Sequence, residues 1–202
     1  MNVGVLASGS GSNLQALIDA QAQGDLGRAH IAVVGVNVAA AGALGRARAA
    51  GVPTFVLDHR DHGSREAFDQ ALAATLVGHG IDLVVLAGFM RILTAGFLSA
   101  FPGRVINIHP SLLPAFPGVN AQAQAFRFGA KVSGCTVHFV EPSVDTGPII
   151  AQTAVPIFDD DDEERVRQRI LVEEHKLLPA VVRAISEARV KIEGRRVRVA
   201  PA

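Results

Sequence analysis

Short apolar runs alternate with longer segments of helical periodicity along the first half of the chain. The apolar runs predict strands at residues 3–7, 31–38, 53–57 and 82–87. The periodic segments between them predict helices at residues 13–23, 41–50 and 64–79. The run DLVVLA at 82–87 is continuously apolar, which is typical of strands covered on both faces. This alternation predicts a doubly wound parallel sheet with right-handed crossovers, Rossmann-like in the N-terminal half.

The pattern changes after Gly88. The second half predicts helices at 94–100, 121–128 and 163–187, strands at 104–108, 135–140 and 149–157, and a terminal hairpin at 190–199. The connection 141–148 is too short for a helical crossover, so its two strands are expected to be antiparallel. The expected fold class is therefore α/β, with one mostly parallel sheet that contains an antiparallel strand in the C-terminal half. Because no linker, repeat or charge block divides the chain, we expect a single domain over residues 1–202.

Composition and charge narrow the possible functions. Half of the residues are apolar (49%) and only 19% are charged, which excludes a disordered chain. The 19 Lys and Arg balance the 19 Asp and Glu, whereas a general nucleic-acid binder is normally basic. Cys135 is the only cysteine, and no Lys or Arg precedes Arg28, so neither a disulfide framework nor a signal peptide is indicated. No uncharged apolar stretch reaches the roughly 20 residues that span a bilayer. We expect a cytoplasmic protein without nucleic-acid or membrane partners.

A glycine-rich turn, SGSGSN at residues 8–13, joins the first predicted strand to the first helix. Small residues allow a ligand to approach the backbone, and a helix N-terminus offers free N–H groups and a positive dipole end. This combination is typical of phosphate binding. The dinucleotide fingerprint is not met, because Leu14 stands where its third glycine is required, and no Gly-Lys-Ser/Thr follows for a nucleoside-triphosphate loop. A tight turn capped by Ser12 or Asn13 is the simpler alternative.

Asn107 and His109 are predicted to share one side of a strand at its carboxyl end, where open α/β sheets bind ligands. Asp145 lies in a Gly- and Pro-containing turn after the strand that bears His138. A carboxylate near an imidazole favours the protonated imidazole and can organise proton transfer through water. A histidine that ends a strand and an aspartate that shapes a turn are the more usual explanation of such residues, and the spacing alone only suggests a catalytic role.

Other arrangements match known sites poorly. Cys135, His138 and His109 do not have the spacing of a zinc site, and no Gly-x-Ser-x-Gly elbow is present. The acidic residues 159–164 lack the glycine and spacing of a calcium loop and suit the start of the long helix. The arginines near the C-terminus are most simply a solvated strand face. We expect no metal site.

Six segments carry a family resemblance: SGSGSNLQALI at 8–18, LAGFMRIL at 86–93, INIHPSLLPAFPG at 106–118, SGCTVHFV at 133–140, VDTGPIIAQ at 144–152 and EEHKLLP at 173–179. Together they resemble the folate-dependent phosphoribosylglycinamide formyltransferases of purine biosynthesis, and the likeness spans nearly the whole chain. The resemblance implies transfer of a formyl group from 10-formyltetrahydrofolate to the glycinamide amine. The folate would be a cosubstrate, with no tightly bound cofactor.

The resemblance also implies roles for individual residues. The catalytic trio would be Asn107, His109 and Asp145, with Asn107 and a protonated His109 stabilising the oxyanion. The ribonucleotide would be held by Gly11, Ser12, Asn13 and Glu174. The folate would be held by Arg65, Met90, Arg91, Ile92, Leu93 and Asn107. The resemblance thus assigns about residues 1–100 to a phosphate-binding half and about residues 101–202 to a catalytic and folate half, although the folate residues 65 and 90–93 precede that boundary.

The chain departs from the family pattern at two places. Asn120 and Gln122 stand where relatives often carry histidines, and the loop after the second strand reads Val36-Asn37-Val38 without the expected Ser-Asn start. Competing interpretations are a formyltetrahydrofolate hydrolase, which uses water as the acceptor, and a non-catalytic folate- or nucleotide-binding module. The expected partners are the two small substrates, and the chain is expected to be a monomer or a homodimer.

Overall fold

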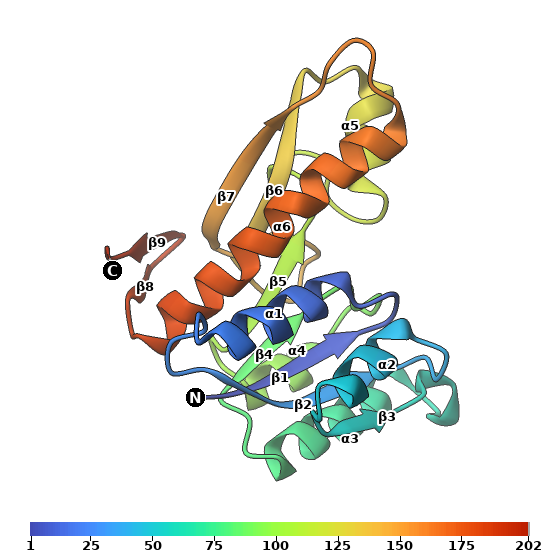
Figure 1. The fold of residues 1–202 in the computed structure, drawn as a ribbon. Coiled ribbons are helices and arrows are strands. Elements are labelled where there is room, and N and C mark those ends of the chain that lie inside the picture. The colour runs from blue at the N-terminus through green and yellow to red at the C-terminus, as the bar shows by residue number, and fades with distance from the viewer. Residues whose placement is uncertain (202) are drawn as a thin grey trace.

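The structure, a computed structural model, describes residues 1–201 and contains a continuous seven-stranded sheet (Figure 1). Its strands are β1 (Asn2–Ala7), β2 (His30–Val36), β3 (Thr54–Val56), β4 (Leu83–Leu86), β5 (Val105–His109), β6 (Val132–Phe139) and β7 (Ile149–Pro156). They follow the order β3-β2-β1-β4-β5-β6-β7. Only β6 runs antiparallel to its neighbours β5 and β7, and the other pairs in this sheet are parallel. The predicted fold class, with one antiparallel strand in the C-terminal half, is confirmed.

Helices cover both faces of the sheet. They are α1 (Ser12–Gln23), α2 (Gly42–Ala49), α3 (Arg65–Gly78), α4 (Ala95–Ala100), α5 (Ala121–Phe128) and α6 (Glu163–Ser186). Helices α1, α2, α5 and α6 contribute to one hydrophobic core, whereas α3 and α4 form the other with the opposite face of the sheet. Successive residues of β1 divide between these cores, with Val5 in the first and Leu6 in the second, as strand alternation requires.

Side chains begin several of the helices near the predicted positions. The hydroxyls of Ser64 and Thr94 accept hydrogen bonds from N–H groups in the first turns of α3 and α4, and Asp162 does the same for α6. The short 3₁₀ helix His59–Asp61 was not predicted, and its start depends on the Asp58 carboxylate, which accepts from the Arg60 N–H. The sequence predicted this strand from residue 135, but β6 begins at Val132. Residues 132–134 are small and only weakly apolar, and they join the strand because they pair with the end of β7.

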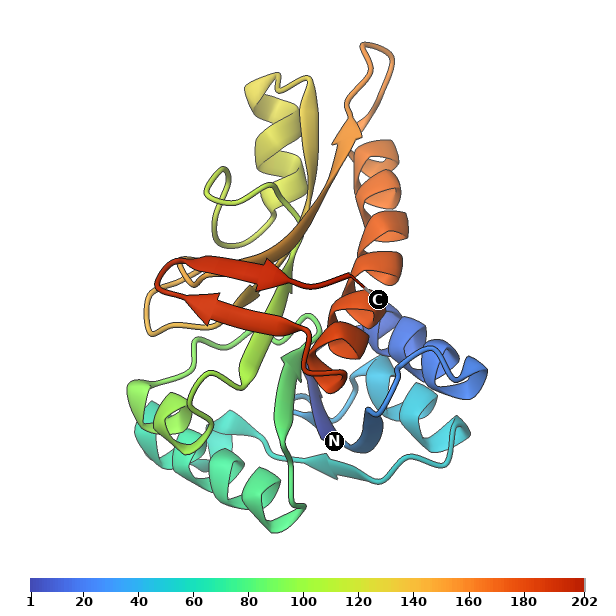
Figure 2. The same cartoon turned by 90° about the vertical axis from the view of Figure 1, so that its left-hand side faces the viewer.

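A small antiparallel sheet follows α6. It consists of β8 (Val190–Glu193) and β9 (Arg196–Val199), the predicted terminal hairpin (Figure 2). Contacts join β9 to β7, and the Arg195 guanidinium at the hairpin turn donates to the Thr146 carbonyl at 2.7 Å. Arg195 is therefore more than part of a solvated strand face, because it contacts the loop that carries Asp145.

The topology determines where a ligand site can form. The strand order reverses direction between β1 and β4, and open α/β sheets bind ligands outside the carboxyl ends of the strands at such a point. The turn 8–13 follows β1, and residues 88–94 follow β4. The glycine-rich turn and the predicted folate segment therefore flank the same crevice.

Helix α1 begins at a glycine that is closely packed. Gly11 is its N-cap residue, with φ of 75°, and a Cβ atom there would lie 2.7 Å from the Ala43 Cα atom in α2. Gly24, which ends the same helix with φ of 78°, has no atom within 4 Å of the corresponding position. Substitutions at Gly11 and Gly24 can therefore be compared to separate the loss of stability due to a left-handed backbone from the loss due to the close contact.

We expect Gly24→Ala to lower the free energy of unfolding by about 1 kcal/mol, because a non-glycine residue must then adopt the left-handed conformation. Gly11→Ala is expected to cost about 1–3 kcal/mol more, because its methyl group overlaps the α2 backbone. Urea denaturation of both variants measures the difference. Equal losses of stability would show that α2 yields and that the close packing of the turn is unimportant.

Candidate active site

The glycine-rich turn is held against α2 by backbone contacts. The Gly9 carbonyl accepts from the Ala43 N–H at 3.2 Å, and the Ser10 carbonyl accepts from the Arg46 guanidinium at 2.8 Å. No side chain caps the first turn of α1, whose N-cap residue is Gly11, so the alternative of a turn capped by Ser12 or Asn13 is wrong. The N–H groups at this helix end therefore remain available to an anion.

Asn13 and Glu174, two of the predicted ribonucleotide residues, are in direct contact. The Asn13 side-chain amide donates to the Glu174 carboxylate at 2.8 Å, although 161 residues separate them. Glu174 lies in the buried stripe of α6, and burial raises the pKa of its carboxyl group against the opposing hydrogen bond from Asn13. The Asn13 Oδ1 atom is buried without a hydrogen-bond partner. A buried carboxyl group thus lies directly beside the phosphate-type turn.

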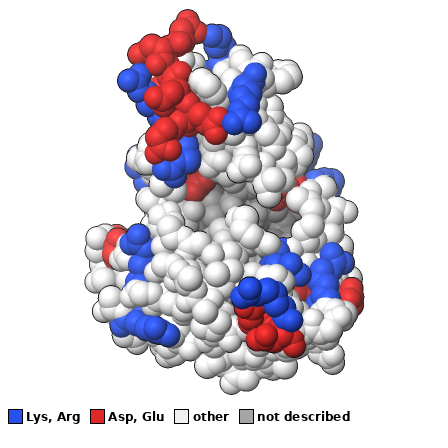
Figure 3. Space-filling view, turned by 90° about the vertical axis from the view of Figure 1, so that its right-hand side faces the viewer, with Lys and Arg blue, Asp and Glu red and all other residues white. Residues whose placement is uncertain are grey.

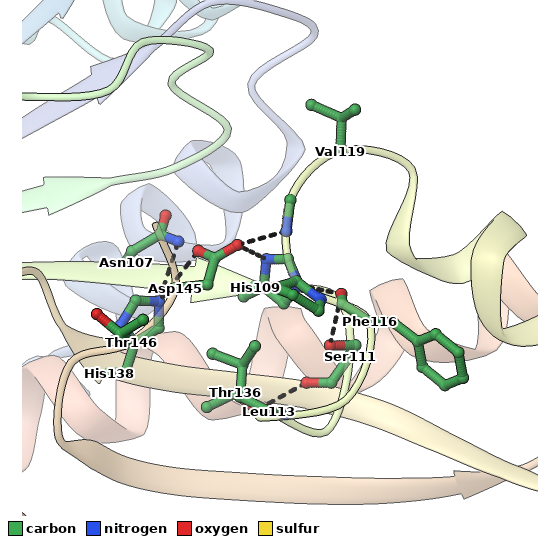
Figure 4. A network of polar contacts seen from close by, with 12 residues as sticks. Asn107, His109, Ser111, Leu113, Phe116, Val119, Thr136, His138, Asp145 and Thr146 are labelled. Carbon is green, nitrogen blue, oxygen red and sulfur yellow. Dashed lines mark hydrogen bonds and ion pairs between the residues drawn. The ribbon is translucent and has the colours of Figure 1, made fainter. Parts of the chain in front are cut away.

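Asp145 connects the residues of the predicted catalytic trio (Figure 4). Its Oδ2 atom lies 3.3 Å from His109 Nδ1 and accepts from the Gly118 N–H at 2.7 Å. Its Oδ1 atom lies 3.6 Å from His138 Nε2. The side chain is only 10% exposed, and the residue has a left-handed backbone with φ of 53°. The turn after Val144 therefore directs this carboxylate between two imidazoles.

His138 links Asn107 to Asp145. Residues 107 and 138 are paired directly across β5 and β6, and the Asn107 amide nitrogen lies 3.2 Å from His138 Nε2. His138 Nδ1 is 2.8 Å from the Phe139 carbonyl oxygen, which only accepts, so Nδ1 carries a proton. Nε2 lies between the Asn107 amide nitrogen and the Asp145 Oδ1 atom. An N–H of the Asn107 amide has no other partner among residues 1–201 and is available to a ligand.

His109 is held by the loop that follows β5. Its Nε2 atom lies 2.9 Å from the Phe116 carbonyl, while Nδ1 faces Asp145. Ser111 and Thr136 stabilise this loop: the Ser111 hydroxyl donates to the Ala115 carbonyl at 2.6 Å, and the Thr136 hydroxyl donates to the Ser111 carbonyl at 2.6 Å (Figure 4). Both ring nitrogens of His109 therefore face oxygen atoms.

The protonation of His109 differs from the prediction. Burial lowers the pKa of His109 below 6.5, and this effect outweighs the Phe116 carbonyl and the Asp145 charge, which raise it. The Asp145 charge raises the pKa of His109 as expected, but burial has the larger effect, so the expectation that Asp145 holds His109 protonated in the free site is not supported. Burial also opposes ionisation of Asp145, but its interactions with His138, the Gly118 N–H and His109 together outweigh burial and lower the pKa of this carboxyl group. The free site thus pairs a charged carboxylate with an imidazole that loses its proton readily.

The predicted folate segment, residues 90–93, lies beside the turn. Met90 and Ile92 are 66% and 51% exposed, whereas Leu93 is buried. The Arg91 guanidinium lies over the Phe68 ring at 5.9 Å, and its Nε atom is buried without a partner. Two apolar side chains are therefore free to cover a flat ligand.

Within residues 1–201, no hydrogen bond or ion pair joins Arg65 to Asn107, His109 or Asp145. Arg65 begins α3 and lines a groove of about 640 Å³ between α3 and α4, together with Thr94. Its ion-pair partner is Glu66, at 3.9 Å. Within residues 1–201, no hydrogen bond or ion pair joins Arg65 to the segment 90–93. The structure therefore connects the members of the trio and joins Asn13 to Glu174, whereas among residues 1–201 no hydrogen bond or ion pair links Arg65 to either group.

The face of the molecule at the carboxyl ends of the strands is hollowed across its middle (Figure 3). Charged side chains gather above and below the hollow, and its walls are mostly uncharged. A groove of about 700 Å³ between α1 and α6 is lined by Ser12, one of the predicted nucleotide residues, together with Arg46, His175 and Lys176. None of Asn107, His109 and Asp145 lines that groove.

Three contributors to the site were not predicted: His138, the Gly118 N–H and the Phe116 carbonyl. The strand alternation that aligned Asn107 with His109 did not give the register between β5 and β6, which brings His138 opposite Asn107. Across residues 1–201, no group of three or more His, Cys, Asp or Glu is arranged to bind a metal ion. Among the same residues, none of the helices has the length and apolar character needed to cross a bilayer.

Comparison with known proteins gives consistent relatives. Phosphoribosylglycinamide formyltransferase of Mycobacterium tuberculosis is 50% identical over 191 residues, which cover 95% of this chain and 87% of that protein. The trifunctional purine biosynthetic protein adenosine-3 of Chironomus tentans is 48% identical over 191 residues. That match covers 94% of this chain but only 14% of the insect protein, so the chain corresponds to a small part of that relative.

Solved structures agree with the sequence relatives. The crystal structure of glycinamide ribonucleotide transformylase 1 from Symbiobacterium toebii superposes with a TM-score of 0.97 at 52% identity, covering 100% of this chain and 94% of that one. Phosphoribosylglycinamide formyltransferase from Anaplasma phagocytophilum gives a TM-score of 0.92 at 40% identity, covering 100% and 95%. The sequence profile described as formyl transferase matches residues 1–182. The chain therefore belongs to the formyl transferase family.

Proposed function

We propose that this protein transfers the formyl group of 10-formyltetrahydrofolate to the amine of phosphoribosylglycinamide, a step in the synthesis of the purine ring. The products are the N-formyl nucleotide and tetrahydrofolate. The observation that carries the proposal is the buried Asp145 carboxylate between His109 and His138, together with the Asn107 amide, which contacts the His138 imidazole. A protein that only bound folate or nucleotide would not require this arrangement.

The ribonucleotide occupies the N-terminal side of the cleft. Its phosphate accepts from the N–H groups of Gly11, Ser12 and Asn13, where α1 has no side-chain cap. The buried Glu174 beside Asn13 meets the ribose or glycinamide end. The residues proposed to bind the nucleotide therefore lie before the catalytic trio in the sequence, except for Glu174, which α6 places beside Asn13 in the glycine-rich turn.

The folate occupies the side of the cleft formed by residues 90–93. Met90 and Ile92 cover the heterocycle with their exposed apolar side chains, while backbone groups of Arg91 and Leu93 contact its polar edge. Arg65, farther along the surface, meets the negatively charged end of the cosubstrate. Asn107 then contacts the formyl group. The folate is consumed in each turnover and is not a resident cofactor.

In the chemical step the glycinamide nitrogen attacks the formyl carbon, and negative charge develops on the formyl oxygen. The free N–H of Asn107 and the imidazole of His109 stabilise this oxyanion, and a well-placed donor of this kind contributes about 3–4 kcal/mol. Because burial lowers the pKa of His109, the imidazole takes up its proton during the reaction: the proton that the attacking nitrogen loses passes through water to His109 as the oxyanion forms. The charge of Asp145 stabilises the resulting imidazolium.

Asp145 also completes the proton balance. A new C–N bond forms between the amine and the formyl carbon, and the bond from that carbon to N10 of the folate breaks. The attacking nitrogen loses one proton, and N10 gains one. Asp145 stays charged and orients the water that carries this proton from the amine to His109 and, as the intermediate collapses, from His109 to N10.

The decisive assay measures tetrahydrofolate release from 10-formyltetrahydrofolate with and without phosphoribosylglycinamide. We expect release to require the ribonucleotide and to match N-formyl product mole for mole. Release at the same rate without the ribonucleotide would identify a hydrolase. Binding of either ligand without any product would identify a non-catalytic module.

The proposed proton transfer also predicts how His109 titrates. NMR of the free protein should give a His109 pKa below 6.5, because burial disfavours the imidazolium. Asp145→Asn should lower this pKa further, since it removes a charge that raises it. Asp159→Asn is the matched control, because Asp159 is exposed and pairs with Lys131 far from the site. A His109 pKa that rises in Asp145→Asn would contradict the assigned interaction.

A further inference from the structure

Ser8 joins the two loops that flank the cleft. It is the first residue after β1 and begins the glycine-rich turn, whereas Met90 begins the folate segment after β4. The Ser8 N–H donates to the Gly88 carbonyl at 2.9 Å, and the Ser8 hydroxyl accepts from the Met90 N–H at 2.8 Å. One residue of the turn therefore holds the start of the folate segment through both its backbone and its side chain.

Asn37 orients the Ser8 hydroxyl. It follows β2, is only 3% exposed, and its Oδ1 atom accepts from the Ser8 hydroxyl at 2.6 Å. Because a serine hydroxyl has one proton, donation to Asn37 leaves its lone pairs for the Met90 N–H. Three loops, after β2, β1 and β4, are thus connected by two consecutive hydrogen bonds at the carboxyl edge of the sheet.

The far end of the folate segment is anchored separately. The Thr94 N–H donates to the Asp69 carboxylate at 2.5 Å, and Asp69 in α3 is buried. Met90 and Ile92 between these two anchors keep their side chains exposed. The end at Thr94 is therefore tied to α3, and only the end at Met90 is tied to the turn assigned to the nucleotide.

We propose that Ser8 is a positioning residue that couples the two substrate sites: order imposed on the turn by the nucleotide passes through the Ser8 hydroxyl to Met90 and favours folate binding. This rests on the proposed function, because it takes both ligand sites from it. Coupling of this kind is reciprocal, so the nucleotide and the folate must each raise the affinity for the other by the same factor.

The test measures the dissociation constant of a non-reactive deazafolate analogue with and without saturating phosphoribosylglycinamide. In the unaltered protein we expect the ratio of the two constants to be at least about fivefold. In Ser8→Ala the ratio should fall to about one, and the Met90 amide should exchange its hydrogen about five- to tenfold faster in the free protein. Affinity for the nucleotide alone should change by less than about twofold, because Ser8 precedes the N–H groups assigned to phosphate.

Matched variants separate this role from general stability. Ser99→Ala removes a hydroxyl that donates to the Gly96 carbonyl within α4, and it should leave the ratio unchanged. Ser8→Thr retains the hydroxyl and should retain the coupling. Asn37→Ala removes the acceptor and should weaken the coupling. The double variant Ser8→Ala/Asn37→Ala should match Ser8→Ala, because Asn37 acts through Ser8.

The outcomes distinguish this proposal from the proposed function. If the unaltered protein binds both ligands and Ser8→Ala keeps the full ratio, the coupling role of Ser8 is wrong and the proposed function stands. Equal weakening of deazafolate binding with and without the nucleotide would also overturn it, because Ser8 would then shape the folate site alone. If the unaltered protein binds neither ligand, the proposed function fails, and the coupling fails with it. Should Ser8→Ala not fold, the ratio in Asn37→Ala decides, and an undiminished ratio there overturns the proposal.

Discussion

The contact between the Asp145 carboxylate and the His109 imidazole is the interaction on which the candidate site depends. Burial alone would keep both groups neutral, because charged forms are costly away from water. Asp145 nevertheless stays charged, since His138 and the Gly118 N–H interact with its two oxygens. His109 in turn loses its proton readily, yet keeps two oxygen atoms within reach of its ring nitrogens. The pair is thus prepared to share a proton whose position changes during a reaction.

The sheet explains how residues so distant in sequence form one cleft. The reversal of strand order between β1 and β4 opens a crevice, and the antiparallel strand β6 then brings His138 opposite Asn107. Helix α6 packs in the same hydrophobic core as α1 and places Glu174 in hydrogen-bond contact with Asn13. We propose that the N-terminal half thereby binds the phosphate while the C-terminal half supplies the chemistry, within one continuous sheet.

Regular patterns were the predictable part of this structure. Alternating apolar runs gave the parallel strands, and the short connection 141–148 gave the antiparallel one, because both depend on local sequence. Strand alternation and the family resemblance pointed to Asn107, His109 and Asp145, and these residues do converge. The register that adds His138 and the loop carbonyl of Phe116 depend on tertiary packing, which no local pattern contains. The expectation of a protonated His109 failed for the same reason, because the direction of its pKa shift depends on how deeply tertiary packing buries the ring.

The central claim is that Asp145 acts on the chemical step, and steady-state kinetics of Asp145→Asn test it most directly. The substitution keeps the shape of the side chain but removes its charge. The turnover number should fall by about 10²–10⁴-fold while the Michaelis constants for both substrates change little, the pattern of an interaction made mainly in the transition state. The control variant Asp159→Asn removes the charge of an exposed carboxylate distant from the cleft, and it should leave turnover unchanged. Near-normal turnover in a folded Asp145→Asn variant would contradict the account and make Asp145 a residue that only shapes its turn.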